Sequence, residues 1–67
     1  MTVVRIDDYV FDAKRFLYAE ITGYGVRIHL EGAKESLLIH TRTQIVARER
    51  LKEVQNIVND VLSSGNQ

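Results

Sequence analysis

The sequence predicts a small α+β domain in which an antiparallel β-meander of three or four strands is packed on one face by a single C-terminal amphipathic helix. Two patterns support this fold class. Residues 16–42 alternate apolar and polar side chains between glycine-containing turns, which is typical of half-buried strands. Residues 44–63 instead repeat apolar side chains every three or four positions, which is typical of a helix lying on a core. We therefore treat residues 1–67 as one domain.

The first reversal of the meander is predicted at Gly23-Tyr24, because a glycine in first position suits a two-residue type II′ hairpin loop. A hairpin centred there aligns three cross-strand pairs: Glu20 with Arg27, Ile21 with Val26, and Ala19 with Ile28. One pair joins opposite charges and the other two are apolar, so the register is chemically consistent. Tyr24 lies at the tip of this hairpin, where it is available for contacts.

The second reversal is predicted in a loop around residues 32–35. Centring that loop on Ala33-Lys34 aligns two further pairs: Leu30 with Leu37, and Ile28 with Ile39. Strict alternation then gives the sheet an apolar inner face. The members of this face are Leu17, Ala19, Ile21, Val26, Ile28, Leu30, Leu37 and Ile39. An apolar face of this kind has to be buried against another element of the structure.

The C-terminal segment, residues 44–63, is the predicted cover. Its apolar stripe consists of Ala47, Leu51, Val54, Ile57, Val58, Val61 and Leu62. Thr43 precedes the helix as a suitable N-cap, and Gly65 can adopt the left-handed αL conformation that often ends a helix. Residues 64–67 are expected to form a frayed tail.

Residues 1–12 are predicted to form an N-terminal strand or hairpin. They are rich in β-branched and aromatic side chains but are interrupted by Asp7-Asp8. The aspartates either make a bulge in one kinked strand or form the turn of a loose hairpin. The stretch from Asp12 to Arg15 is predicted to be a polar connection. The alternative is a short helix that is N-capped by Asp12 and runs to Leu17.

Composition excludes several classes of site and partner. Nine basic residues balance nine acidic ones, so no net field draws the chain towards nucleic acid or an anionic membrane. The lack of cysteine excludes disulfides and thiolate zinc sites. No apolar run approaches a membrane span of about 18 residues, and no signal peptide is recognisable. We expect a cytoplasmic protein that gains its stability from a compact core, from oligomerisation, or from both.

The opposite, outer face of the meander is the candidate functional surface. By alternation it carries Phe16, Tyr18, Glu20, Arg27, His29, Glu31, Leu38, His40 and Arg42. In the predicted register Tyr18, His29 and Leu38 lie side by side, whereas a fully solvated face would be polar throughout. One helix cannot cover both faces of a sheet, so we expect the outer face to bind a second copy or another protein. The candidate contact residues are Phe16, Tyr18, Arg27, His29, Leu38, His40 and Arg42. A solvated face with scattered apolar residues is the simpler alternative.

We expect neither an enzyme nor a metal or cofactor site. His29 and His40 are predicted to sit diagonally on adjacent strands, roughly 7–8 Å apart at the backbone, but Arg27 lies beside them and opposes a cation. The serines stand in no nucleophile motif, and an extended Asp7-Asp8 would point its two carboxylates to opposite faces. Without convergent catalytic groups, no small-molecule substrate is indicated.

Single-stranded nucleic acid is the alternative partner. Phe16, Tyr18 and His29 offer rings on which bases can stack, and Arg27 and Arg42 offer charges for phosphates. However, two carboxylates share this face, the net charge is zero, and the chain carries no aromatic ribonucleoprotein signature. The preferred interpretation is a non-catalytic protein–protein interaction or regulatory module that self-associates.

Overall fold

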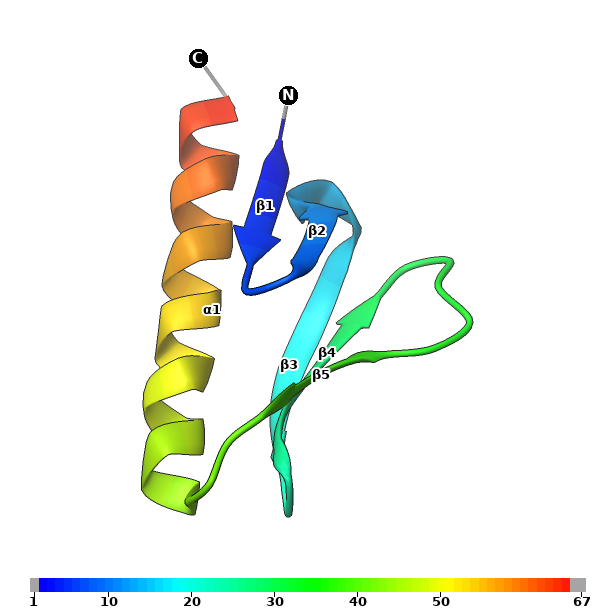
Figure 1. Cartoon of the computed structure of the whole chain (residues 1–67). Helices are drawn as coiled ribbons and strands as arrows, with labels where there is room; N and C mark the ends of the chain where they lie inside the picture. The colour runs from blue at the N-terminus through cyan, green and yellow to red at the C-terminus, as the bar shows by residue number, and fades with distance from the viewer. Residues whose placement is uncertain (1, 66–67) are drawn as a thin grey trace.

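The computed structural model describes residues 2–65, which fold into two antiparallel β-sheets packed against one α-helix (Figure 1). In chain order the elements are β1 (Val3–Ile6), β2 (Tyr9–Asp12), the 3₁₀ helix η1 (Ala13–Arg15), β3 (Phe16–Thr22), β4 (Gly25–Leu30), β5 (Leu37–His40) and α1 (Gln44–Gly65). Strands β1 and β2 form a hairpin of their own, and β3, β4 and β5 form a three-stranded meander. The predicted fold class, an α+β meander with one C-terminal helix, is confirmed.

The N-terminal segment is a hairpin and not a single kinked strand. Asp7 and Asp8 form its two-residue turn, with Ile6 opposite Tyr9 and Val4 opposite Phe11. Asp7 adopts a left-handed conformation with φ 53°, which aspartate tolerates better than most residues. Its carboxylate oxygen Oδ1 accepts a hydrogen bond from Nη2 of Arg50 at 2.8 Å, so the turn is tied to α1.

The connection between the two sheets is a single 3₁₀ turn. The Asp12 carboxylate caps it, accepting from the backbone N–H of Lys14 at 2.9 Å and from the hydroxyl of Thr2 at 2.6 Å. The helical alternative therefore identified the correct cap. Its length was wrong, because Phe16 already adopts an extended backbone and begins β3.

The first hairpin of the meander has the predicted register, with Glu20 opposite Arg27 and the neighbouring apolar pairs aligned. Its turn type differs from the prediction. A type II′ turn needs a positive φ at Gly23, whereas the glycine with a positive φ is Gly25, at 147°. The loop is instead fixed by Thr22, whose Oγ1 accepts from the backbone N–H of Tyr24 at 3.1 Å.

A β-bulge at Leu17 reverses the predicted orientation of the first two residues of β3. Phe16 lies opposite Leu30 while Tyr18 lies opposite His29, so Leu17 is the extra residue. Phe16 therefore packs against the core, and Leu17 is 56% exposed. The prediction that Phe16 faces outward and Leu17 inward was wrong. Turning the phenyl ring inward buries more apolar area than the leucine would.

The second hairpin is shifted by two residues from the predicted register. Ile28 lies opposite Leu37 and Val26 opposite Ile39. The chain turns immediately after β4: Ala33 donates to the Leu30 carbonyl at 3.3 Å, and Gly32 has a φ of 78°. This early turn leaves the end of β4 without a partner on β5. Because side chains alternate between the two faces, a shift of two residues leaves each side chain of β5 on the face predicted for it.

The arginine before β3 helps to fix both irregularities. The Arg15 carbonyl accepts from the backbone N–H of Glu31 at 2.7 Å. In return, Nε and Nη2 of Arg15 donate to the Glu31 carbonyl at 3.0 and 2.8 Å. These contacts hold the end of β4 against the start of β3, which favours the early turn away from β5.

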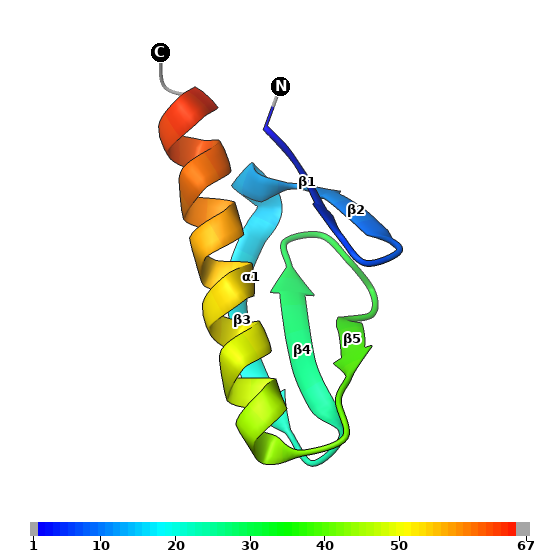
Figure 2. The same ribbon diagram turned by 60° about the vertical axis from the view of Figure 1, so that its left-hand side comes forward.

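The core lies between the inner face of the meander, α1 and the N-terminal hairpin. Figure 2 shows α1 running along β3 and β4, with β5 as the edge strand farther from the helix. The buried residues are Val4, Ile6, Phe11, Ala13, Val26, Ile28, Ile39, Ala47, Val54 and Val58. The hairpin is also held to the meander by Tyr9, whose hydroxyl donates to the Leu38 carbonyl at 3.0 Å.

Helix α1 begins where predicted and ends two residues later than predicted, at Gly65. Thr43 acts as the expected N-cap, because its Oγ1 accepts from the backbone N–H of Val46 at 3.2 Å. The predicted tail is helical at residues 64–65, and residues 66–67 lie outside the described part of the chain. Within residues 2–65, α1 falls short of the apolar character that crossing a membrane requires.

We expect Gly25→Ala to destabilise the domain by about 3 kcal/mol or more. A Cβ at this position would lie 1.9 Å from the Ile39 carbonyl oxygen, and the φ of 147° disfavours any L side chain. Gly23→Ala is the matched control, since a Cβ there meets no atom within 4 Å. Urea unfolding of both variants measures the difference, and equal stabilities would contradict the close approach of Gly25 to β5.

Asp12 is expected to make stability depend on pH. The hydrogen bond from Thr2 and the one from the Lys14 backbone lower the pKa of this carboxyl group below its usual value. The stabilisation is therefore present above the unfolded-state pKa of about 3.9 and is lost as the pH falls through the lower folded pKa. Asp12→Asn should reduce stability at pH 7 and should differ less from wild type in acid. Unfolding curves from pH 7 to pH 2 check this, and Thr2→Val should raise the carboxyl pKa measured by NMR titration.

Candidate functional site

The outer face of the meander, on the side away from α1, carries a small apolar patch. We define the outer patch as Leu17, Tyr18, His29 and Leu38. Leu17 and Tyr18 are 56% and 50% exposed, whereas His29 and Leu38 are partly buried. Leu17 joins the patch through the bulge in β3, and the other three residues lie on the outer face of regular strands.

The centre of the outer patch is a stack of two rings. Tyr18 and His29 are directly opposite each other on β3 and β4, their ring centroids are 4.3 Å apart, and the planes differ by 20°. Such an offset pair contributes beyond its buried area, by about 0.5–1.5 kcal/mol for aromatic pairs. The stack holds both rings in one orientation, and it leaves only one face of the tyrosine ring free.

One ring nitrogen of His29 is buried beneath this surface. Nε2 lies 3.5 Å from Oε2 of Glu20 and makes no hydrogen bond to any described residue. The nearest acceptor to this nitrogen is therefore the Glu20 carboxylate, and an N–H at Nε2 would point its donor at a carboxylate on the outer face.

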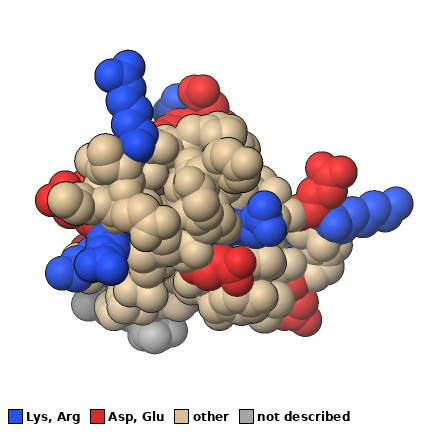
Figure 3. Space-filling view, turned by 90° about the horizontal axis from the view of Figure 1, so that it is seen from below, with Lys and Arg blue, Asp and Glu red and all other residues tan. Residues whose placement is uncertain are grey.

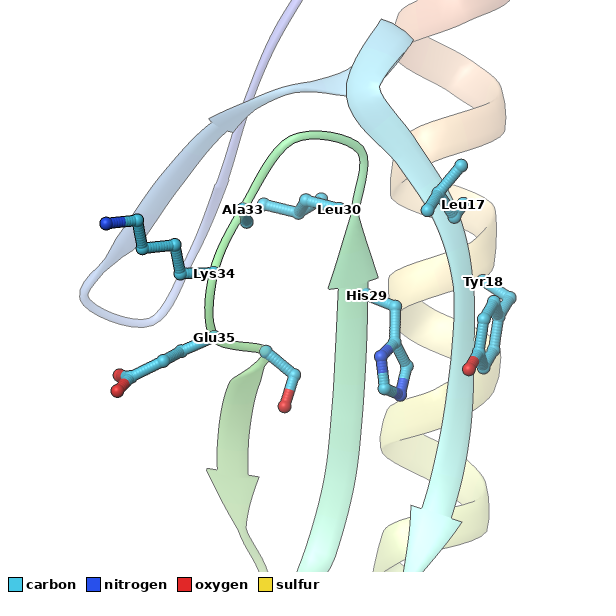
Figure 4. A pocket seen from close by; sticks show the side chains of 8 residues that line it. Leu17, Tyr18, His29, Leu30, Ala33, Lys34 and Glu35 are labelled. Carbon is cyan, nitrogen blue, oxygen red and sulfur yellow. The ribbon is translucent and has the colours of Figure 1, made fainter.

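A hollow of about 350 Å³ adjoins the stack. It is lined by Leu17, Tyr18, His29, Leu30, Ala33, Lys34, Glu35 and Ser36. Figure 4 shows the two rings at one side of the hollow and the loop between β4 and β5 at the other, with the Lys34 and Glu35 side chains directed away from the rings. The hollow is thus open, with apolar side chains and rings along one wall, and it suits an inserted side chain better than a buried cofactor.

The sequence-predicted contact residues divide into groups. Tyr18 and His29 pair as predicted, but Leu38 lies opposite Arg27 and diagonal to His29. Arg27 lies opposite Glu20, as predicted. Phe16 packs on the inner face, so the prediction that it is a contact residue of the outer face was wrong.

Of the other predicted residues, His40 is the last residue of β5, and the prediction that Arg42 lies on the outer face of this strand was wrong, because Arg42 lies in the connection between β5 and α1. His40 pairs with Gly25, four residues along β4 from His29, which corresponds to about 13 Å of strand. The predicted diagonal contact between the two histidines was wrong, because it depended on the unshifted register of β5. Residues 2–65 bring no three His, Cys, Asp or Glu side chains into an arrangement that could hold a metal ion.

Sequence reasoning missed several exposed apolar residues. Leu17 was assigned to the interior, and a bulge has no clear signal in a run of apolar residues. Ile45 and Val46, at the start of α1, are 72% and 41% exposed. Both residues lie outside the apolar stripe that the helical spacing predicts, so their exposure could have been predicted from the sequence.

No protein-family model, curated protein or solved structure matches this chain.

Substitutions at the bulge test which of its two apolar residues is internal. Phe16→Ser should destabilise the domain by about 2 kcal/mol or more, because a core contact is lost. Leu17→Ser should change stability by less than about 0.5 kcal/mol, because the side chain is exposed. Chemical unfolding at a protein concentration low enough to keep the chain monomeric measures both. The opposite ranking would contradict the bulge and restore simple alternation.

Proposed function

We propose that the protein is a non-catalytic interaction module that self-associates through the outer face of its β3–β4–β5 sheet. The observation that carries the proposal is the outer patch. Leu17 and Tyr18 are at least half exposed beside an open hollow, on a face that α1 cannot cover. Exposed aromatic and aliphatic residues beside a concave surface are the usual anchors of protein interfaces.

The charges around the outer patch favour a second copy of the chain. Glu20 and Arg27 lie opposite each other on this face, so it carries both signs next to its apolar residues. In a dimer with two-fold symmetry, each carboxylate can meet a cation of the other copy. The chain carries no net charge, so two copies do not repel each other over long range.

The size of the domain supports the same conclusion. A chain of 67 residues has a total stability of about 3–10 kcal/mol at the usual per-residue average. Only ten side chains form its buried apolar core among the described residues. Burying Leu17, Tyr18 and Leu38 against a second copy adds apolar contacts that the monomer lacks.

Single-stranded nucleic acid is the second candidate, favoured by the exposed Tyr18 ring beside Arg27. Two features weaken it. One face of the Tyr18 ring is already occupied by His29, and the side chain of Glu20 stands next to that stack. A backbone phosphate would meet this carboxylate.

Tyr18→Glu is expected to convert the protein to a monomer. A carboxylate in the middle of the outer patch loses the ring contact and cannot be desolvated without cost. We expect the dimer dissociation constant to rise by a factor of about ten or more. Light scattering coupled to size-exclusion chromatography measures the mass of each variant.

Val10→Glu is the matched control. Val10 lies on β2, is 62% exposed and is not part of the outer patch, so this substitution should leave the mass unchanged. A wild-type protein that is monomeric at all accessible concentrations would contradict self-association. Salt-sensitive binding of a single-stranded oligonucleotide, weakened by Arg27→Ala, would support the second candidate instead.

A further inference from the structure

The hollow beside the outer patch lies where β4 extends beyond β5. Strand β5 begins opposite Ile28, so the last two residues of β4, His29 and Leu30, have no partner on that strand. The loop between the two strands passes around this unpaired end, and Ala33 and Ser36 of the loop line the hollow together with His29 and Leu30. The position of the hollow is therefore set by the backbone, through the early turn after β4.

The hollow is large enough to receive a side chain. Its volume of about 350 Å³ is well above the roughly 30 Å³ that one water molecule occupies. The same volume is at the small end of protein ligand sites, which span about 300–1,000 Å³. Because the hollow opens on the outer face of the sheet, a side chain from another molecule can enter it directly.

One wall of the hollow is itself an exposed leucine. Leu17 lines the hollow from the β3 side, and 56% of its surface is exposed. It is the extra residue of the β-bulge, so it has no partner on β4. In Figure 4, Leu17 and the loop of Ala33 lie on opposite sides of His29. An apolar side chain open to solvent and a hollow that can receive such a side chain therefore lie next to each other on the same face.

We propose that Leu17 of each copy inserts into the hollow of the other copy in a dimer with two-fold symmetry. The inference rests on the proposed self-association through the outer face and names the contact at its centre. In an isologous interface both copies offer the same surface, so a projection on one must meet a depression on that same surface of the other. A two-fold axis in the plane of the interface, running between Leu17 and the hollow, exchanges the two. One copy thus carries both halves of the contact.

The charges at the rim also favour a second copy. Lys34 and Glu35 are adjacent and exposed on the loop that borders the hollow. A strongly acidic partner would meet Glu35, and a strongly basic partner would meet Lys34. A second copy has no net charge and brings the same pair of opposite charges. Figure 3 shows acidic and basic side chains close together around one end of the molecule, so the mixture of signs extends beyond this loop.

Filling the hollow tests the contact without changing the outer patch. Ser36 lines the hollow but is not a member of the patch, and Ser36→Trp places a large ring in this space. We expect the dimer dissociation constant, measured by analytical ultracentrifugation, to rise at least about tenfold. Asn59→Trp is the matched control, because Asn59 is exposed on α1, and it should associate as the wild type does. If Ser36→Trp unfolds, Ala33→Trp on the same loop fills the hollow instead.

Disulfide trapping identifies the contact between the two copies. The chain contains no cysteine, so each introduced thiol is unique. The Leu17→Cys and Ser36→Cys proteins are mixed and mildly oxidised, and mass spectrometry compares the mixed disulfide with the two symmetric ones. We expect the mixed product to exceed its share in a random mixture, because residue 17 of one copy lies beside residue 36 of the other. Val10→Cys mixed with Ser36→Cys is the control and should give random proportions.

The possible failures are distinguishable. A dimer that Ser36→Trp weakens no more than Asn59→Trp does, or disulfides in random proportions, would overturn the inference and leave self-association standing. A wild-type protein that stays monomeric would overturn both the inference and the proposed function. N-acetyl-leucinamide is then the probe: if it shifts the amide signals of residues 33–36 in the ¹⁵N-labelled monomer, the hollow receives an aliphatic side chain of a different protein, against this proposal.

Discussion

The structure depends on one packing contact, the burial of the inner face of β4 beneath α1 and the N-terminal hairpin. Val26 and Ile28 on the strand are completely buried, as is Val54 on the helix. Each such side chain contributes about 1.5–3 kcal/mol by leaving water. Because the whole domain has only a modest stability, the loss of one of these contacts would remove a large part of it. The hydrogen bonds from Tyr9 and Arg50 then hold the hairpin against this core.

This arrangement also determines where function can reside. The helix and the hairpin pack against the inner side of the meander, so among residues 2–65 the outer side is the face that α1 does not cover. The bulge at Leu17 adds an exposed leucine to the outer side next to the Tyr18–His29 stack. Tyr24 in the β3–β4 turn and Ile45 at the start of α1 are exposed as well. The pairing of β3 with β4 and of β4 with β5 fixes the positions of Tyr18, His29 and Leu38 on the outer side.

The parts of the fold that follow from periodicity were predictable. The helix follows from the helical spacing of its apolar residues. The two faces of β4 and β5 follow from alternation. The register of the first hairpin follows from alternation together with the pairing of Glu20 and Arg27. These features were correct because each is supported by several residues at once. An error at one position does not change such a pattern.

The features that were missed depend on single backbone contacts. The bulge at Leu17 and the two-residue shift of β5 are fixed by hydrogen bonds of Arg15 and by the early turn at Gly32. No periodic pattern records such contacts. For the same reason the candidate site was only half predictable. Tyr18 and His29 were placed correctly, whereas Phe16 and His40 were displaced by the bulge and the shift.

The central claim is that a chain with one covered sheet face gains stability when a second copy covers the other. The most direct measurement is the thermal unfolding midpoint over about a hundredfold range of protein concentration. Folding coupled to association requires the midpoint to rise with concentration, by mass action. A midpoint that stays constant over that range would mean that the core beneath α1 is sufficient on its own and that the outer face is left to solvent.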